Sequence, residues 1–295
     1  MGAIRKVVTW LLATWRWLTA THRRRRNLAL TITLLTSPAW AVLSAPAVVP
    51  PSTDDGLGPP GLAPPEVMAA ITAGRPEGYP VGGIDISSHD HRNFGVHWRT
   101  ELAVDTEFVY IKATEGTTYV NPHFAADYAT AKKAHRYVGA YVFARPDRGD
   151  PVGQAEHFLR NARYTRDDRT LVPFVDLEWP YTGNMDRCYG LKPEQMRAWI
   201  TAFIGRIERG IGRKPMIYTN TYWWNPCTGS DPSFGDYPLD IANYTKRAPV
   251  LPAGWSKFAL WQYTAGNPER RYDHDRDVVS GGLAGLAALA WTRSR

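Results

Sequence analysis

The sequence contains little cysteine and no long apolar run. Cys188 and Cys227 are the only cysteines among its 295 residues. An even count in a chain with export features favours one disulfide between two loops, and two unpaired thiols are the alternative. The apolar segments at residues 7–18 and 28–35 are both shorter than a comfortable membrane span. We therefore expect no stable membrane domain, apart from a leader that could remain uncleaved.

Beyond its first 41 residues the chain carries no net charge. The whole sequence has a net charge of +7 and a pI near 9.4. Residues 1–41 contain seven of the 35 basic residues and none of the 28 acidic ones, which leaves equal numbers of both signs in the remainder. The basicity belongs to this segment alone, so we expect no nucleic-acid partner.

Residues 1–41 have the features of an export leader, and residues 42–80 those of a linker. The basic run Arg23–Arg26 precedes the apolar run Leu28–Leu35 and then the small-residue motif Ala39-Trp40-Ala41. This is the order of a signal peptide with its cleavage site. Residues 42–80 are rich in proline and glycine and cannot bury a core. A secreted or cell-wall-associated domain is expected over residues 81–295.

From residue 81 onward, short β-rich runs alternate with helical patterns. Helices are expected at Pro122–His135, Gln154–Ala162 and Glu194–Arg209. Eight strands are expected at Gly83–Ser87, Phe108–Ala113, Tyr137–Ala144, Leu171–Glu178, Pro215–Asn220, Leu239–Tyr244, Phe258–Tyr263 and Asp277–Val279. The alternation predicts an α/β fold, a modified (β/α) barrel of eight strands with helices mainly in the first half. Helical patterns fade between the later strands, so loops are expected there.

The strand at residues 171–178 ends in two acids, Asp176 and Glu178. Side chains alternate along a strand, so both carboxyl groups point to the same side, with Cα atoms roughly 6–7 Å apart. Two close carboxyl groups in a partly dry site do not ionise together easily, which raises one pKa. A protonated acid beside a carboxylate is the arrangement that glycoside hydrolysis requires. Solvated acids, or acids paired with arginine, are the common alternative for an isolated pair.

Polar residues also end most of the other expected strands. In a β/α barrel the active site lies at these carboxyl ends. Asp85, Asp176 and Glu178 would meet there, together with Asp275. The residues expected to contact substrate at the same end are Glu115, Tyr141, Tyr218, Asn243, Trp261 and Gln262. A structural bridge to a carboxylate is the alternative for Gln262, and Lys112 is expected to pair with Asp85 or Glu115 in a buried charge network. His89, Asp90, His91 and His274 lack the spacing of a metal site, so we expect no metal and no cofactor.

Five motifs in register resemble the glycoside hydrolase family 25 lysozymes. They are Gly83-Ile84-Asp85-Ile86-Ser87, Lys112-Ala113-Thr114-Glu115-Gly116, Gly139-Ala140-Tyr141, Asp176-Leu177-Glu178 and Trp261-Gln262-Tyr263. The resemblance covers residues 82–290. It implies a modified β/α barrel and an N-acetylmuramidase that cuts peptidoglycan between N-acetylmuramic acid and N-acetylglucosamine.

The resemblance also implies roles for the four acids. Glu178 would be the general acid, Asp176 would steady the N-acetyl group or the developing cation, and Asp85 would lie on the floor of the site. Asp275 would take the place of the last acid, with Asp273 and Asp277 as neighbouring alternatives. An acetamido sugar can supply its own carbonyl as nucleophile, and direct water attack with inversion is the alternative.

Three positions depart from the family pattern, and two other functions stay open. Val142 stands where the family often has histidine, Asp240 where it often has tryptophan, and Asp277 where the final Asp-x-Asn motif has asparagine. These changes concern the fit of the substrate more than the acid. The alternative functions are a non-catalytic peptidoglycan-binding barrel and a chitin-directed glycosidase. We expect a monomer whose partner is the peptidoglycan glycan strand.

Overall fold

The computed structural model describes residues 65, 74–104, 106–162, 165–180, 185–267 and 271–291. These residues all belong to one compact unit, Thr53–Arg295. The expected leader and nearly all of the expected linker lie outside the described residues. None of the helices in the described ranges is both long and apolar enough to cross a bilayer.

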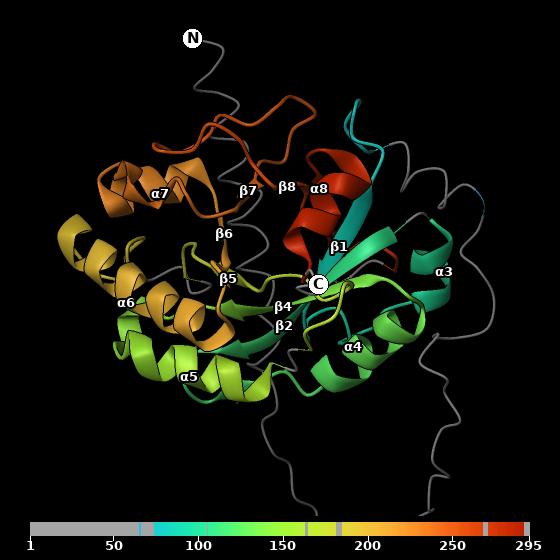
Figure 1. Ribbon diagram of the computed structural model, residues 1–295, viewed down its shortest axis with the longest axis horizontal. Coiled ribbons are helices and arrows are strands. Elements are labelled where there is room, and N and C mark those ends of the chain that lie inside the picture. Colours follow the sequence, from blue (N-terminus) through green and yellow to red (C-terminus); the bar gives the residue numbers. More distant parts are fainter. Residues whose placement is uncertain are drawn as a thin grey trace, which may run out of the picture. The chain divides into compact units, whose positions relative to one another are not determined.

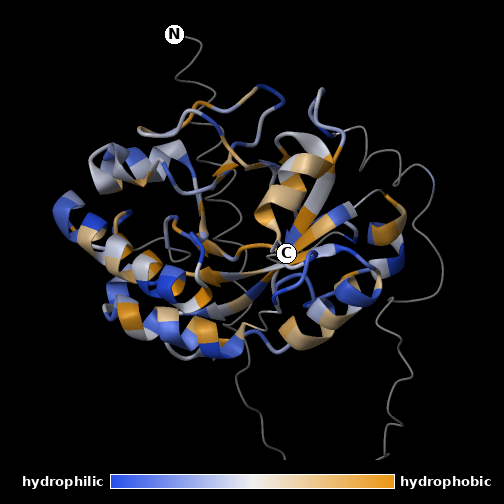
Figure 2. Cartoon of the chain, viewed as in Figure 1, coloured by the Kyte–Doolittle hydropathy of each residue, from blue (hydrophilic) through white to orange (hydrophobic). Residues whose placement is uncertain are grey.

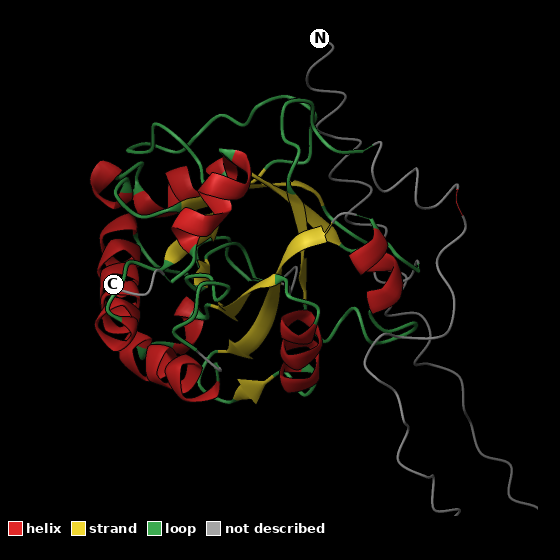
Figure 3. Cartoon of the chain, turned by 45° about the vertical axis from the view of Figure 1, so that its right-hand side comes forward, coloured by secondary structure: helices red, strands yellow, loops and turns green. Residues whose placement is uncertain are grey.

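Eight strands form a closed ring. Around the ring they are β1 (Gly82–Ile86), β2 (Thr106–Glu115), β4 (Tyr137–Phe143), β5 (Phe174–Asp176), β6 (Met216–Thr219), β7 (Leu239–Ala242), β8 (Leu260–Thr264) and β9 (Asp275–Val279). Neighbours from β1 to β8 pair in parallel, whereas β9 runs antiparallel to both β8 and β1 and closes the ring. Figure 3 shows the strands at the centre and the helices outside them. The predicted eight-stranded α/β barrel is confirmed.

The three expected helices are present at α4 (Phe124–Lys133), α5 (Pro151–Asn161) and α6 (Pro193–Ile211). In Figure 1, α5 and α6 lie along one side of the barrel and α4 lies beside β2 and β4. The helix α6 starts with a proline at its first position, where the missing N–H costs nothing, and ends at Gly212 with a φ of 76°. Its buried stripe, which includes Met196, Ile200 and Phe203, packs on the barrel.

Three further α-helices and one short strand within the described residues were not predicted from the sequence. The helices are α3 (Trp98–Ala103), α7 (Thr221–Thr228) and α8 (Gly282–Leu289), and the strand is β3 (Tyr119–Val120). They are short, and α7 contains Pro226, which hides the helical pattern. The expectation of loops between the later strands is wrong for β6 and β7, which α7 connects. It is correct from β7 to β9, where the described residues form no helix.

Alternation along the strands separates two apolar cores. Ile84, Ile86 and Val109 point outwards to the helices, whereas Phe108 and Tyr110 point into the barrel. The inner core lies at the amino-terminal end of the strands, where Leu286 and Leu289 of α8 cover it. Figure 2 shows α8 in the colours of apolar residues. Each large apolar side chain buried in this way contributes about 1.5–3 kcal/mol. The opposite end of the barrel is left for polar groups.

Candidate active site

The inward-facing side chains of the strands are apolar at the amino-terminal end of the barrel and include several acids at the carboxyl-terminal end. On β1, Asp85 lies between the outward-facing Ile84 and Ile86, so its side chain points inwards, and it is 8% exposed. The register of β1 and β9 pairs Asp85 with Asp275. On β5, Phe174 faces the inner core and Val175 the outer one, which turns Asp176 into the barrel. The expected clustering of Asp85, Asp176 and Asp275 follows from these registers.

Glu178 lies two residues beyond the end of β5, because the strand is shorter than expected. The backbone continues in an extended path: the Leu177 N–H donates to the Tyr218 carbonyl at 3.0 Å, and the Thr219 hydroxyl donates to the Leu177 carbonyl at 2.7 Å. The Leu177 side chain packs in the outer core, so Asp176 and Glu178 share the inner side. The Tyr189 hydroxyl holds the Glu178 carbonyl at 2.9 Å.

Burial raises the pKa of both acids of this pair. It raises the pKa of Glu178 to about 7, and the positive charge of Lys112 opposes the rise. The pKa of Asp176 is raised well above its ordinary range, first by burial and then by the charge of Glu178. Within the described residues, Oδ1 of Asp176 is buried without a hydrogen-bond partner. The pair therefore holds at least one proton near neutral pH.

The side-chain amide of Gln262 connects the other acids. Its Nε2 donates to Asp85 Oδ2 at 2.6 Å and to Asp275 Oδ2 at 3.4 Å. Its Oε1 accepts the hydroxyls of Tyr218 at 2.8 Å and Tyr244 at 2.9 Å. A primary amide offers two donors and two acceptor sites, so these four bonds use all of them. The structure thus makes Gln262 a bridge between strands, which is the alternative to substrate contact that the sequence left open.

A charge network borders the Asp176 and Glu178 pair. Lys112, which is 3% exposed, donates to Glu115 Oε2 at 2.9 Å. Arg145 donates to Glu115 Oε1 at 2.9 Å and to Asp147 at 2.7 and 2.8 Å. These cations lower the pKa of Glu115 despite its burial. Both oxygens of Glu115 are engaged by cations, so the structure gives this expected substrate contact the role of holding Lys112 beside the acids.

The remaining expected contacts divide between the two faces of the strands. Tyr141 points into the barrel, where its ring stacks on that of Phe174 with the ring centroids 4.5 Å apart. The ring of Tyr218 also stacks on Phe174, with the centroids 5.5 Å apart. Asn243 follows β7 and is partly exposed. Trp261 is 1% exposed and packs in the outer core, with its ring N–H on the Asn243 carbonyl at 2.8 Å. The structure therefore does not bring Trp261 to the site, because it alternates with the inward-facing Gln262.

Trp223 and Trp224 also lie away from the site. Both are fully buried in the outer core, where Trp224 meets Phe234 and Trp255 edge to face. The aromatic side chain that sequence reasoning omitted is Tyr244. It is 46% exposed, and its hydroxyl lies on Gln262. Its place directly after β7, beside Asn243, was the signal that could have identified it.

Two more acids lie inside the barrel. Asp240 on β7 and Asp277 on β9 are each 1% exposed. Burial raises the pKa of both well above the ordinary range. The charge of Asp85 adds to the rise at Asp240, and the charges of Asp240 and Asp275 add to it at Asp277, where a hydrogen bond with Asp85 opposes it. Asp277 was considered as an alternative to Asp275 and, like Asp240, as a departure from the family pattern. Asp275 is the acid that Gln262 and the backbone N–H of Gly266 hold at this end of the barrel.

A disulfide joins Cys188 to Cys227, with the Cα atoms 5.2 Å apart. It ties the segment that follows Glu178 to the buried face of α7. The predicted disulfide is confirmed. The described residues contain no group of three or more histidine, cysteine, aspartate or glutamate side chains arranged to hold a metal ion.

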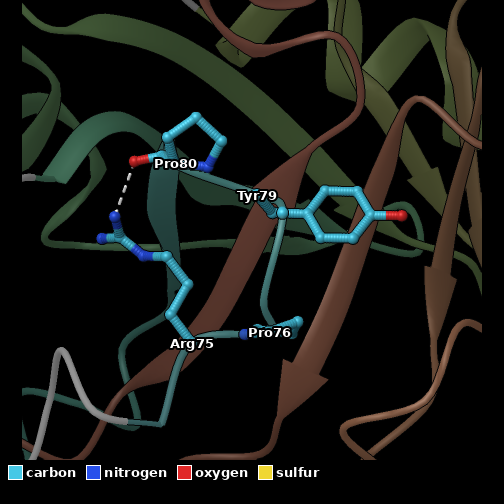
Figure 4. Close-up of a pocket in the computed structure, with 5 residues that line it drawn as sticks. Arg75, Pro76, Tyr79 and Pro80 are labelled. Carbon is cyan, nitrogen blue, oxygen red and sulfur yellow. Dashed lines mark hydrogen bonds between the residues drawn. The ribbon is translucent and has the colours of Figure 1, made fainter.

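A hollow of about 310 Å³ lies on residues that precede β1. It is lined by Arg75, Pro76, Gly78, Tyr79 and Pro80, and Arg75 closes one side by donating to the Pro80 carbonyl at 2.7 Å (Figure 4). None of the acids described above lines it, so its lining offers none of the groups that acid catalysis requires.

Comparison with known proteins agrees with this geometry. Residues 84–269 match the family described as Glycosyl hydrolases family 25. The chain is 39% identical over 214 residues to Lysozyme M1 of Streptomyces globisporus, a match that covers 71% of each protein. It is 36% identical to an N,O-diacetylmuramidase of Chalaropsis sp, over 71% of this chain and 99% of that protein.

Solved structures show the same barrel. A bacterial lysozyme from Streptomyces coelicolor superposes with a TM-score of 0.66 at 37% identity, over 72% of this chain and 98% of that one. A family GH25 lysozyme from Aspergillus fumigatus superposes with a TM-score of 0.65 at 38% identity, over 72% and 99%. The expected resemblance is confirmed, and the chain belongs to family 25 of the glycosyl hydrolases.

Proposed function

We propose that this glycoside hydrolase is a muramidase that cuts the β-1,4 bond between N-acetylmuramic acid and N-acetylglucosamine in peptidoglycan. The names of its relatives, a lysozyme and an N,O-diacetylmuramidase, support this substrate. The single observation that carries the proposal is the acid pair at the end of β5, where Asp176 and Glu178 share the inner side beside Lys112. A binding module would gain nothing from two buried acids that destabilise each other.

Glu178 is assigned as the general acid. An acid must be protonated before it can protonate a leaving group, and a pKa of about 7 keeps Glu178 largely protonated at mildly acidic pH and about half protonated at neutral pH. Glu178 is also more exposed than Asp176, which is 6% exposed. It can therefore reach a glycosidic oxygen that lies beyond the end of the strand.

Asp176 is assigned to the acetamido group of the substrate. Its side chain is 6% exposed at the end of the strand, and the accessible part of its carboxylate can accept the amide N–H. This contact would orient the acetamido oxygen toward the anomeric carbon and stabilise the positive charge that develops during its attack. Asp85 and Asp275, held by Gln262, would line the floor beneath the sugar. All the assigned acids come from one chain, which supports action as a monomer on the cell wall after export.

The test is an end-group assay on purified peptidoglycan with the full chain and its Glu178→Gln variant. Reduction with borohydride should yield muramitol with the native protein, and at least about 100-fold less with the variant, because general acid catalysis contributes about 10²–10⁴-fold. Glu77→Gln, an exposed glutamate before β1, is the matched control and should retain full activity.

The other outcomes separate the alternatives. Glucosaminitol in place of muramitol would indicate glycoside hydrolysis at the other glycosidic bond of peptidoglycan, which leaves the new reducing end on N-acetylglucosamine. Cleavage of chitin at a comparable rate would favour the chitin-directed glycosidase. Binding to the wall without new reducing ends would overturn the enzymatic assignment. The configuration of the first-formed anomer tests acetamido participation, which requires retention.

A further inference from the structure

A buried histidine lies next to the site and has no role in the chemistry above. His274 immediately precedes β9 and is 5% exposed. Its Nδ1 lies 2.8 Å from Asp90 Oδ1, although 184 residues separate them in sequence. Asp275, the next residue, is one of the assigned acids. Any force that holds His274 in place therefore acts on the start of β9.

Asp90 connects this histidine to the end of β1. Its second oxygen, Oδ2, accepts the backbone N–H of Ser87 at 2.8 Å and the Ser87 hydroxyl at 3.3 Å. Ser87 directly follows β1, whose Asp85 pairs in register with Asp275. A chain of hydrogen bonds thus runs from the start of β9, through His274 and Asp90, to the end of β1. It spans the same two strands that carry Asp85 and Asp275.

The charges around His274 favour its protonated form. On α3, the fully buried Glu101 places Oε1 3.8 Å from His274 Nε2, and Oε1 also accepts Arg276 Nη2 at 3.2 Å. The bond and charge of Asp90 and the charge of Glu101 raise the pKa of His274, against the opposing effects of burial and Arg276. The His274 bond and charge lower the pKa of Asp90 against its burial.

Loss of the proton would weaken this arrangement. A neutral imidazole donates through one nitrogen only, so a ring that still donates from Nδ1 to Asp90 presents the lone pair of Nε2 to the Glu101 carboxylate. A raised pKa means that the stabilisation is complete below the unfolded value, near 6.5, and is lost as the pH rises through the folded value. Asp85 and Asp275 also feel this change, because the charge of Asp90 raises the pKa of both.

We propose that His274, as an imidazolium bonded to Asp90, is a positioning residue that sets the relative placement of Asp85 and Asp275. The proposal rests on the roles assigned to these two acids in the proposed function. It assigns no contact with substrate to His274 itself.

The first test uses the unaltered full chain. The ring nitrogens of His274 are followed by NMR during a pH titration, with the resonance assigned by its absence in His274→Gln. The ring should titrate with a midpoint above that of an unperturbed histidine, near 6.5, with both nitrogens protonated below the midpoint. A midpoint at or below 6.5 would overturn the proposal without reference to any variant's activity.

The second test measures kcat, KM and thermal stability for His274→Gln, Asp90→Asn and the double variant. Displacement of catalytic groups by a fraction of an ångström to 1 Å costs about 10- to 100-fold. We expect each single variant to lose about that much in kcat while KM changes less than twofold. The double variant should be about as slow as either single variant, because both break the same connection. His135→Asn, at an exposed position after α4 with a φ of 58°, is the control and should match the native protein.

Two results would overturn the proposal: native kcat in both single variants, or losses that multiply in the double variant. A lower midpoint of thermal unfolding with unchanged kcat would reduce His274 to a purely structural residue. The Glu178→Gln variant separates this failure from a failure of the proposed function. Loss of activity in Glu178→Gln together with native kcat in His274→Gln would retain the muramidase and reject only the positioning role.

Discussion

The amide nitrogen of Gln262 lies 2.6 Å from the carboxylate of Asp85, across 177 residues of sequence. This contact joins β8 to β1 through the interior of the barrel, past β9, which separates them in the sheet. The same amide holds Tyr218, Tyr244 and Asp275. The orientation of one side chain therefore determines where four others lie.

Gln262→Glu should abolish this arrangement. The added carboxylate would face Asp85 and Asp275 in the place of the amide donor, and an uncompensated buried charge costs about 3 kcal/mol or more. We expect kcat to fall by at least about 100-fold, and thermal stability to fall more at pH 7 than at pH 4, where the new acid is protonated. Calorimetry and the end-group assay measure the two effects.

Gln195→Glu is the matched control for this change. Gln195 accepts the backbone N–H of Lys192 at 2.9 Å at the start of α6, and glutamate serves equally well in that position. It should leave both activity and stability unchanged. Native activity in Gln262→Glu would show that the bridge is dispensable.

Lys112→Met should move the alkaline limb of the pH–rate profile. Glu178 must be protonated to act, so activity falls as the pH rises through its pKa of about 7. The charge of Lys112 stabilises the ionised form and lowers this pKa, so its removal raises the pKa and shifts the limb to higher pH. The profile of kcat against pH measures the shift.

Lys132→Met is the matched control. It removes a cation of α4 that is bonded to Asp167, and it should leave the alkaline limb in place. A limb that moves to lower pH in Lys112→Met would contradict the assignment of Glu178.

Replacement of both Cys188 and Cys227 by alanine should destabilise the domain without altering its chemistry. The disulfide closes a loop of 39 residues, for which chain entropy gives about 4 kcal/mol. We expect a lower midpoint of thermal unfolding and native kcat at temperatures where the variant is folded. Loss of kcat in the folded variant would indicate that the disulfide positions the segment after Glu178.

Gly139→Ala should disrupt the inner core. A Cβ at this position would lie 2.1 Å from Cε1 of Tyr110, whose hydroxyl donates to the Val172 carbonyl at 2.9 Å. Displacement of this packed ring costs about 1–3 kcal/mol. Gly205→Ala, inside α6 with only the end of Arg209 nearby, should instead stabilise by about 0.5–1 kcal/mol. Denaturant unfolding distinguishes the two, and equal effects would contradict this view of the core.

The strands and the acids were accessible from the sequence because they follow local rules. Period-two alternation places Asp85 between two isoleucines, and the spacing of Asp176 and Glu178 puts both on one face. The same rule should have excluded Trp261, since Trp261 and the adjacent Gln262 cannot both point into the barrel. Trp261 is a neighbour of the site along the sequence, but the face of the strand decides which side chains enter the barrel.

Other features depend on contacts that local sequence does not encode. The bonds from Gln262 to Asp85 and from His274 to Asp90 link residues that are 177 and 184 positions apart in the sequence. The helices α3 and α7 are too short for periodicity to reveal, and their stability comes from packing on the barrel. The sequence predicts a buried charge pair between Lys112 and an acid such as Glu115. Their effect on Glu178 became visible only when the fold brought them together.

The antiparallel strand β9 lies between β1 and β8, so the first strand closes the ring only by pairing with the last one. A chain emerging from the ribosome must therefore release residues 275–279 before the ring can close and before Asp275 can reach Asp85. Contacts between such distant residues form late and slowly. Until then Asp275 is missing from the cluster that Gln262 holds together, so the acids at this end of the barrel are complete only in a chain whose last strand has paired.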